Sequence, residues 1–212
     1  MIDTTTAANR PDYGQAIEYA LDRLRHELPP TLLYHCAWHT EHDVLPAARR
    51  LGQLAGLTQN EQGVLEVSAA YHDVGHIHIS YGHEAISIKI MAEALPRFGF
   101  DPREIERVAT MIMATRMPQS PKNELERLLA DADMDGLGRT DFLDTSKALW
   151  RENTALGRPH QSWAQWLEAQ LRFLRSHRYF SAQARALRED GKQHNIAALE
   201  GMLRDTRDGS IG

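Results

Sequence analysis

The fold is decided by the stretch Ala70-Tyr71-His72-Asp73-Val74-Gly75-His76, which offers an imidazole and a carboxylate side by side. Because neighbouring helical residues point about 100° apart, His72 and Asp73 can converge on one point only near a helix end. Gly75 predicts that end, since glycine often follows the last turn of a helix. The preceding apolar run would seat this helix in a core. A His-Asp pair held rigidly at a helix terminus is suited to a divalent metal.

The composition predicts an ordinary globular protein of one domain. The chain has 212 residues, of which 42% are apolar and 25% charged. A formal net charge of −5 gives no general attraction to long nucleic acids or to an anionic membrane. No apolar run approaches the roughly 20 residues of a membrane span. The single cysteine, Cys36, and a polar start without a signal-peptide layout favour a cytoplasmic protein.

Helical periodicity runs through the whole chain and predicts an all-α, single-domain bundle of eight to nine helices. Capping-box spacing marks two helix starts, at Thr58 and Ser162, and Asp101 with the proline after it marks another. We expect a flexible N-terminus over 1–11, a helical domain over 12–204 and a frayed C-terminus over 205–212. A loop over residues 77–82 should cover the site. The predicted helices cover 12–28, 33–55, 58 to the opening motif, 83–95, 102–115, 123–134, 142–156, 162–177 and 181–204.

Two further histidines, His35 and His39, are four residues apart and predict a pair on one face of the second helix. His42 follows on roughly the same side. Such a pair can act as two metal ligands, or as one ligand and an acid-base neighbour. Chance spacing of surface histidines on a long helix is the alternative interpretation.

An acidic segment, Asp131 to Asp135, is the candidate for the remaining ligand. Asp131 and Asp135 share one side of a helix and predict a solvated helix end. Asp133 points elsewhere, towards an apolar face, where a carboxylate is costly to bury unless it meets a cation.

The combination of His39, His72-Asp73 and a late aspartate resembles the HD superfamily of metal-dependent phosphohydrolases, over about residues 33–142. The resemblance implies an HD-like helical domain and the metal ligands His39, His72, Asp73 and Asp133. Asp133 is preferred because Ala132-Asp133-Met134 matches the family's Ala-Asp-hydrophobic step. Asp131 is the alternative ligand.

Three histidines are implied as catalytic residues. Tyr34-His35 through His39 resembles a segment of cyclic-nucleotide phosphodiesterases, in which the first histidine is the general acid. His83-Glu84-Ala85-Ile86-Ser87 is similar to the His-Glu-x-x-Ser stretch of HD-type deoxynucleotide triphosphohydrolases, where that histidine lies near the scissile phosphate. His76 stands where some members carry a catalytic glutamate. His83, His76 and His35 are therefore the candidates to protonate a leaving group or neutralise phosphate charge.

Imidazole and carboxylate ligands are compatible with Mn, Fe, Ni, Co or Zn, and less readily with Mg. One ion is expected, and Asp73 could bridge to a second. Arg116 and Lys147 are the cations placed to contact a substrate phosphate.

The predicted function is a metal-dependent phosphohydrolase or phosphodiesterase that cleaves a nucleotide or related phosphate ester with metal-activated water. Two alternatives stay open. The first is an HD-type di-iron oxygenase, with His76 and His83 as extra ligands; the second is a nucleotide-binding signalling module without turnover. The expected partner is a small phosphate ester rather than a membrane or a long nucleic acid, and a homodimer is left open. The glycine-tyrosine-proline signature of the cyclic-di-GMP branch is missing, so the resemblance to the superfamily does not indicate which class of substrate is cleaved.

Overall fold

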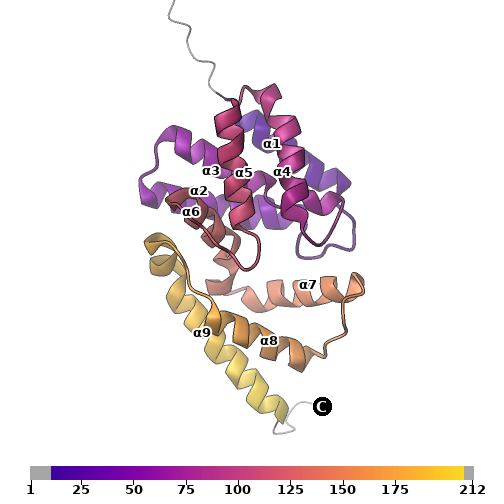
Figure 1. Cartoon of the computed structure of the whole chain (residues 1–212). Coiled ribbons are helices and arrows are strands. Elements are labelled where there is room, and N and C mark those ends of the chain that lie inside the picture. Colours follow the sequence, from indigo (N-terminus) through magenta and orange to yellow (C-terminus); the bar gives the residue numbers. More distant parts are fainter. Residues whose placement is uncertain (1–10, 208–212) are drawn as a thin grey trace, which may run out of the picture.

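The computed structural model describes residues 11–207, and within that range it holds nine α-helices and no strand (Figure 1). The predicted all-α fold is therefore confirmed. The α-helices are α1 (Tyr13–Glu27), α2 (Leu45–Ala55), α3 (Gln59–Tyr71), α4 (His83–Ala94), α5 (Pro102–Ala114), α6 (Glu124–Asp133), α7 (Phe142–Ala155), α8 (Trp163–Ser176) and α9 (Ala182–Arg207). A π-helical segment, η1 (His39–Val44), and three 3-10 segments, η2 (Val74–Ile77), η3 (Leu95–Phe98) and η4 (Asp135–Gly138), complete the helical backbone.

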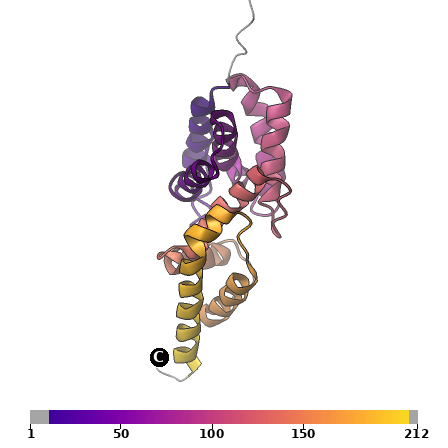
Figure 2. The ribbon, with the colours of Figure 1, turned by 90° about the vertical axis from the view of Figure 1, so that its left-hand side faces the viewer.

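The helices bury two hydrophobic clusters. The larger lies among α1 to α6 and contains side chains with no exposed surface, such as Tyr71 and Leu128. The smaller joins η4 to α7, α8 and α9 through residues such as Phe142 and Leu199. Met134 packs against both clusters. Figures 1 and 2 show α7, α8 and α9 as a lower layer beneath the bundle of α1 to α5, with α6 at the junction.

Most predicted helix ends agree with the structure to within two residues. Capping boxes are present at Thr58, Asp101 and Ser162, each with its side chain accepting from the backbone of the third helical residue. At the C-terminus α9 continues to Arg207, so residues 205–207 are helical rather than frayed. The other expected terminal segments, 1–10 and 208–212, lie outside the described residues.

The predicted helix over 33–55 was wrong at its start. Residues 33–36 form bends, and helical backbone begins only at residue 37. The Glu152 carboxylate accepts hydrogen bonds from the backbone N–H groups of Tyr34 and His35, at 2.8 and 2.9 Å. These bonds satisfy donors that would otherwise begin a helix. His35 and His39 therefore do not share a face of one helix.

Gly75 was also wrongly interpreted, as a residue that ends a helix. The α3 helix ends at Tyr71, and Gly75 lies inside η2 without a positive φ. Its role is steric, because a β-carbon there would clash with the carbonyl oxygen of His83 and lie 2.8 Å from the Ser87 nitrogen. Glycine thus lets α4 pack directly on the turn that carries His72 and Asp73.

Within residues 11–207, no helix combines the length and apolar character needed to cross a membrane.

We expect Gly75→Ala to lower the free energy of unfolding by about 1–3 kcal/mol, because backbone must move to admit the methyl group. Urea denaturation of the full chain measures the change. Gly201→Ala is the matched control, since its β-carbon would meet nothing closer than 3.9 Å inside α9. The free energy of unfolding of the Gly201→Ala control should rise by roughly 0.5–1 kcal/mol, because alanine favours a helix interior over glycine. Equal effects of the two substitutions would contradict the close-packing argument.

Candidate metal centre

Three separate elements bring four side chains to one point. His39 is the first residue of η1, His72 and Asp73 follow the last turn of α3, and Asp133 is the last residue of α6. All four lie within or at the edge of the core, and His39, His72 and Asp73 are each no more than 5% exposed. The predicted ligands are therefore together, although 94 residues separate the first from the last.

The distances among these groups fit a single cation. His39 Nε2 and His72 Nε2 each lie 3.5 Å from Asp133 Oδ1, and His72 Nε2 lies 3.3 Å from Asp73 Oδ2. Ligand atoms about 2.1 Å from one ion are themselves about 3.0–3.4 Å apart in tetrahedral or octahedral sites. His39 Nε2, His72 Nε2 and Asp73 Oδ2 are buried without a hydrogen-bond partner among the described residues. A metal ion would satisfy all three atoms.

Backbone and side-chain groups orient the two imidazoles. His72 Nδ1 lies 2.7 Å from the carbonyl oxygen of Ala69, which fixes that nitrogen as the protonated one and leaves Nε2 free to bind. Asp43 Oδ2 lies 3.7 Å from His39 Nδ1 on the outer side, and Asp43 is itself paired with Arg139. Both rings thus present Nε2 to the shared point.

The carboxylates control the charge of the rings. Burial opposes an imidazolium, but the carboxylates of Asp133 and Asp43, each within 4 Å of the ring, outweigh it and raise the pKa of His39 to about 9. The pKa of His72 is also raised, because Asp73 and Asp133 overcome its burial. In turn His72 lowers the pKa of Asp73 against the effect of desolvation. A site that favours positive charge so strongly favours a cation.

A second group shares Asp73. Ligand atoms of His35, Asp73 and His76 lie within 4.8 Å of one another, and His83 Nε2 lies 3.1 Å from Asp73 Oδ1. The His76 ring is stacked between His35 and His83, with centroid distances of 4.6 and 3.9 Å. Both His76 ring nitrogens are buried without a partner in the described chain. The three predicted catalytic histidines therefore adjoin the first site and could hold a second ion with it.

The pKa values of His76 and His83 are shifted in opposite directions. Burial, reinforced by His35 and His83 against the attraction of Asp73, lowers the pKa of His76 to about 3. The pKa of His83 is raised, because its hydrogen bond to Asp73 and the negative charges of Asp73 and Glu84 together outweigh burial. A neutral ring is suited to metal binding and a protonated ring to proton donation.

The alternative ligand, Asp131, lies elsewhere. Its carboxylate is fully buried and accepts hydrogen bonds from the backbone N–H groups of Phe180 and Ser181, at 2.8 and 2.7 Å, ahead of α9. Asp135 is also buried and binds Arg50 and Arg188. The interpretation of Asp131 and Asp135 as a solvated helix end was wrong, because later parts of the chain cover both.

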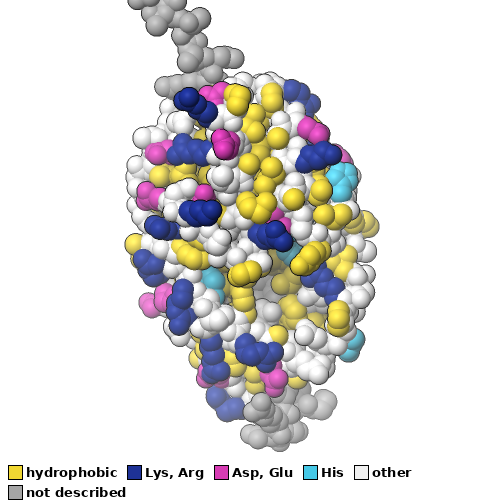
Figure 3. Space-filling view, in the orientation of Figure 1, with side chains coloured by type: hydrophobic (Ala, Val, Ile, Leu, Met, Phe, Trp, Pro, Cys, Tyr) yellow, Lys and Arg dark blue, Asp and Glu magenta, His cyan; other side chains and the backbone are white. Residues whose placement is uncertain are grey.

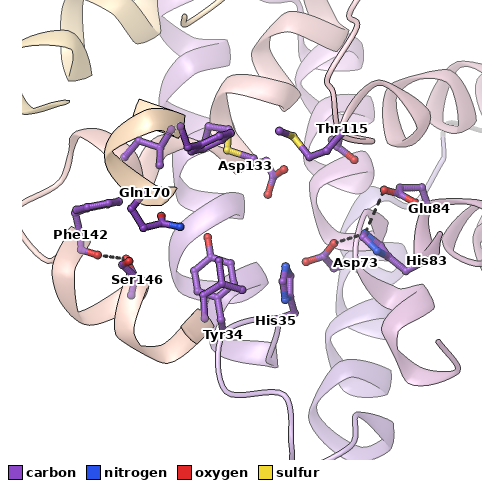
Figure 4. A pocket seen from close by; sticks show the side chains of 17 residues that line it. Tyr34, His35, Asp73, His83, Glu84, Thr115, Asp133, Phe142, Ser146 and Gln170 are labelled. Carbon is purple, nitrogen blue, oxygen red and sulfur yellow. Dashed lines mark hydrogen bonds and ion pairs between the residues drawn. The ribbon is translucent and has the colours of Figure 1, made fainter. Parts of the chain in front are cut away.

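A cavity of about 310 Å³ opens beside the two groups of ligands. Figure 3 shows a hollow between the upper helices and the lower layer, with hydrophobic side chains at its mouth. In Figure 4 Tyr34, His35, Asp73 and Asp133 face the same space, and Gln170 approaches it from α8. His83 and Glu84 line the cavity too, whereas Arg116 and Lys147 are exposed and do not line it. The structure thus does not place the two predicted phosphate contacts in the cavity.

Sequence analysis missed two residues that position the site. Glu152 of α7 is fully buried and lies 2.5 Å from His35 Nδ1, but no local pattern signals this contact across 117 residues. Ser87 lies inside the His-Glu-x-x-Ser stretch, which could have indicated it. Its hydroxyl donates to the His72 carbonyl at 2.7 Å and accepts from the Gly75 N–H at 2.8 Å. Ser87 thereby fixes the turn that carries His72 and Asp73.

Comparison with protein-family models, with curated proteins and with solved structures found no match to this chain.

The two aspartates of α6 can be separated experimentally. Asp133→Asn should lower metal affinity by more than the roughly 10–100-fold that an outer-shell change costs. Asp131→Asn should keep the metal but lose about 1–3 kcal/mol of stability, because its charged hydrogen bonds to the start of α9 are weakened. Metal titration and urea denaturation of both variants make the comparison. If Asp131→Asn lost the metal and Asp133→Asn kept it, Asp131 and not Asp133 would be the metal ligand.

Glu152 gives a pH-dependent prediction. Its pKa is lowered, because its bonds to His35 and to two backbone N–H groups outweigh burial. Its stabilising effect is therefore fully present above the ordinary value of 4.5 and is lost as the pH falls through the lower folded value. We expect Glu152→Gln to cost about 1.5–3 kcal/mol at pH 7. Urea denaturation between pH 3 and 7 should show the variant and the parent converging at the acid end.

Proposed function

We propose that this protein is a metal-dependent phosphohydrolase of the HD type, acting on a small phosphate ester. One observation carries the proposal: buried, unpartnered nitrogen and oxygen atoms of His39, His72 and Asp73 converge with Asp133 beside a cavity. The resemblance in the order of these residues along the sequence supports the same class.

The four residues would hold the ion. When bound, a divalent metal of this kind polarises a phosphoryl oxygen and lowers the pKa of water. The chain's own groups then supply orientation and protons. The Glu152 carboxylate fixes His35 through Nδ1, which leaves Nε2 as the nitrogen able to give a proton to a leaving oxygen. His83, with its raised pKa, is the second candidate donor, and neutral His76 is suited to binding a second ion.

A di-iron oxygenase is the second candidate function. The observation that favours it is the sharing of Asp73 between the two groups of metal-binding side chains. About two irons per chain and an oxygen-dependent product would favour it over hydrolysis. A nucleotide-binding module without turnover is the third outcome, expected to bind one nucleotide tightly while hydrolysing no ester.

The purified full-length chain should contain stoichiometric metal and hydrolyse a simple phosphate ester. His72→Ala and Asp73→Ala should lose both properties, because each removes a ligand. Chelation should lower the melting temperature by roughly 5–10 °C, as expected when a ligand at about 100 times its Kd is removed. Metal analysis, an ester panel and thermal unfolding measure these effects.

His160→Ala is the matched control, since His160 is exposed between α7 and α8. It should retain metal, activity and melting temperature. A metal-loaded protein with no activity on any ester would contradict the hydrolase proposal. Unchanged melting after verified metal removal would contradict the role of the ion in joining η1, α3 and α6.

A further inference from the structure

The cavity beside the proposed metal centre contains no lysine or arginine among the described residues that line it. The acidic and histidine side chains that line it are those of Asp73, Asp133, Glu84, His35 and His83. Asp73 and Asp133 would face the ion, whereas Glu84 would not be neutralised by it. Glu84 is only 7% exposed, with His83 Nε2 3.9 Å away.

This charge distribution opposes a substrate with several phosphates. Proteins hold polyphosphates with arginine, lysine or backbone N–H clusters, because each added charge must be desolvated and paired. A triphosphate or bisphosphate inside the cavity would bring its outer charges towards Glu84, and the described residues that line the cavity include no lysine or arginine to balance them. One phosphoryl group, held by the metal and the histidines, is what the site can neutralise.

The cavity wall contributed by α7 and α8 is mainly hydrophobic. Phe142 and Leu149 of α7 and Phe173 of α8 line it. Met134 and Leu137, which follow Asp133 in the chain, add further hydrophobic surface to the cavity. The polar groups on this wall are uncharged, and include the Gln170 amide and the Ser146 hydroxyl, which already accepts from Trp166 Nε1 at 3.0 Å. Figure 4 shows Phe142, Ser146 and Gln170 across the cavity from His83 and Asp73.

The size of the cavity limits what this wall can receive. Small-molecule pockets span about 300–1,000 Å³, so a volume near 310 Å³ lies at the lower end and favours a compact ligand. Burying apolar substrate surface against Phe173 and Leu149 would supply binding free energy in proportion to the area removed from water.

We propose that the substrate is a phosphate monoester with a single phosphoryl group on a compact, uncharged and largely hydrophobic alcohol. This inference rests on the proposed hydrolase function. In the reaction, water oxygen forms a bond to phosphorus and the phosphorus–oxygen bond to the alcohol breaks. The departing oxygen takes a proton from a histidine, and the products are inorganic phosphate and the free alcohol.

Three esters of primary alcohols test the inference with the metal-loaded full chain: benzyl phosphate, glycerol 3-phosphate and adenosine 5′-triphosphate. The first two have the same phosphate charge and differ in the polarity of the alcohol. We expect kcat/KM for benzyl phosphate to exceed kcat/KM for glycerol 3-phosphate and for adenosine 5′-triphosphate by on the order of tenfold or more. A hydrophobic pocket supplies discrimination of this size.

A matched pair of variants locates the preference. Phe173→Leu should lower kcat/KM for benzyl phosphate by about two- to tenfold, mainly through KM, and lower kcat/KM for glycerol 3-phosphate by a smaller factor. Phe98→Leu is the control, because Phe98 is similarly half-buried but packs against Tyr19 outside the cavity. An equal loss on both phosphates would assign Phe173 a structural role and overturn its part in recognition.

Binding provides a readout apart from turnover. By calorimetry, benzylphosphonate should bind the metal-loaded protein more tightly than methylenediphosphonate does. Faster turnover of adenosine 5′-triphosphate or glycerol 3-phosphate would overturn this inference while the hydrolase proposal stands. Tight benzylphosphonate binding without hydrolysis of any ester would instead overturn the hydrolase proposal and keep the ligand class. Failure of both binding and turnover would overturn both.

Discussion

The meeting of buried Asp73 and partly buried Asp133 with the imidazoles of His39 and His72 is the constraint on which the rest of the structure depends. Two carboxylates this close in the interior repel each other and lose their hydration, so they need positive charge between them. The two histidines supply it in part, because the carboxylates raise the pKa of both imidazoles. The ends of η1, α3 and α6 must meet at one point for this compensation to work.

The lower layer completes what the bundle of α1 to α6 begins. Glu152 of α7 reaches across to His35 and to the backbone of Tyr34, so that the candidate proton donor is set by a helix far away in sequence. Asp131 ties α6 to the start of α9 through two backbone N–H groups. The same layer provides the hydrophobic wall of the cavity. Its contribution is therefore both to hold the site together and to limit what can enter.

Sequence patterns were informative where the cause was local. Capping boxes at Thr58, Asp101 and Ser162 fix helix starts because their hydrogen bonds lie within four residues. The helix predicted to begin at residue 33 was wrong, because the distant Glu152 carboxylate binds the backbone N–H groups of Tyr34 and His35. Because residues 33–36 are not helical, the 100° rule that placed His35 and His39 on one face does not apply between them.

The sequence by itself determined the all-α class, because helical periodicity is a property of short segments. Its resemblance to the HD superfamily singled out His39, His72 and Asp73, with Asp133 or Asp131 as the fourth residue. Only the tertiary structure decided between Asp131 and Asp133 as the group beside His39 and His72, since that depends on which part of the chain covers each carboxylate. It alone revealed Glu152 and the uncharged wall of the cavity. Those features arise from contacts across more than a hundred residues, which no local spacing encodes.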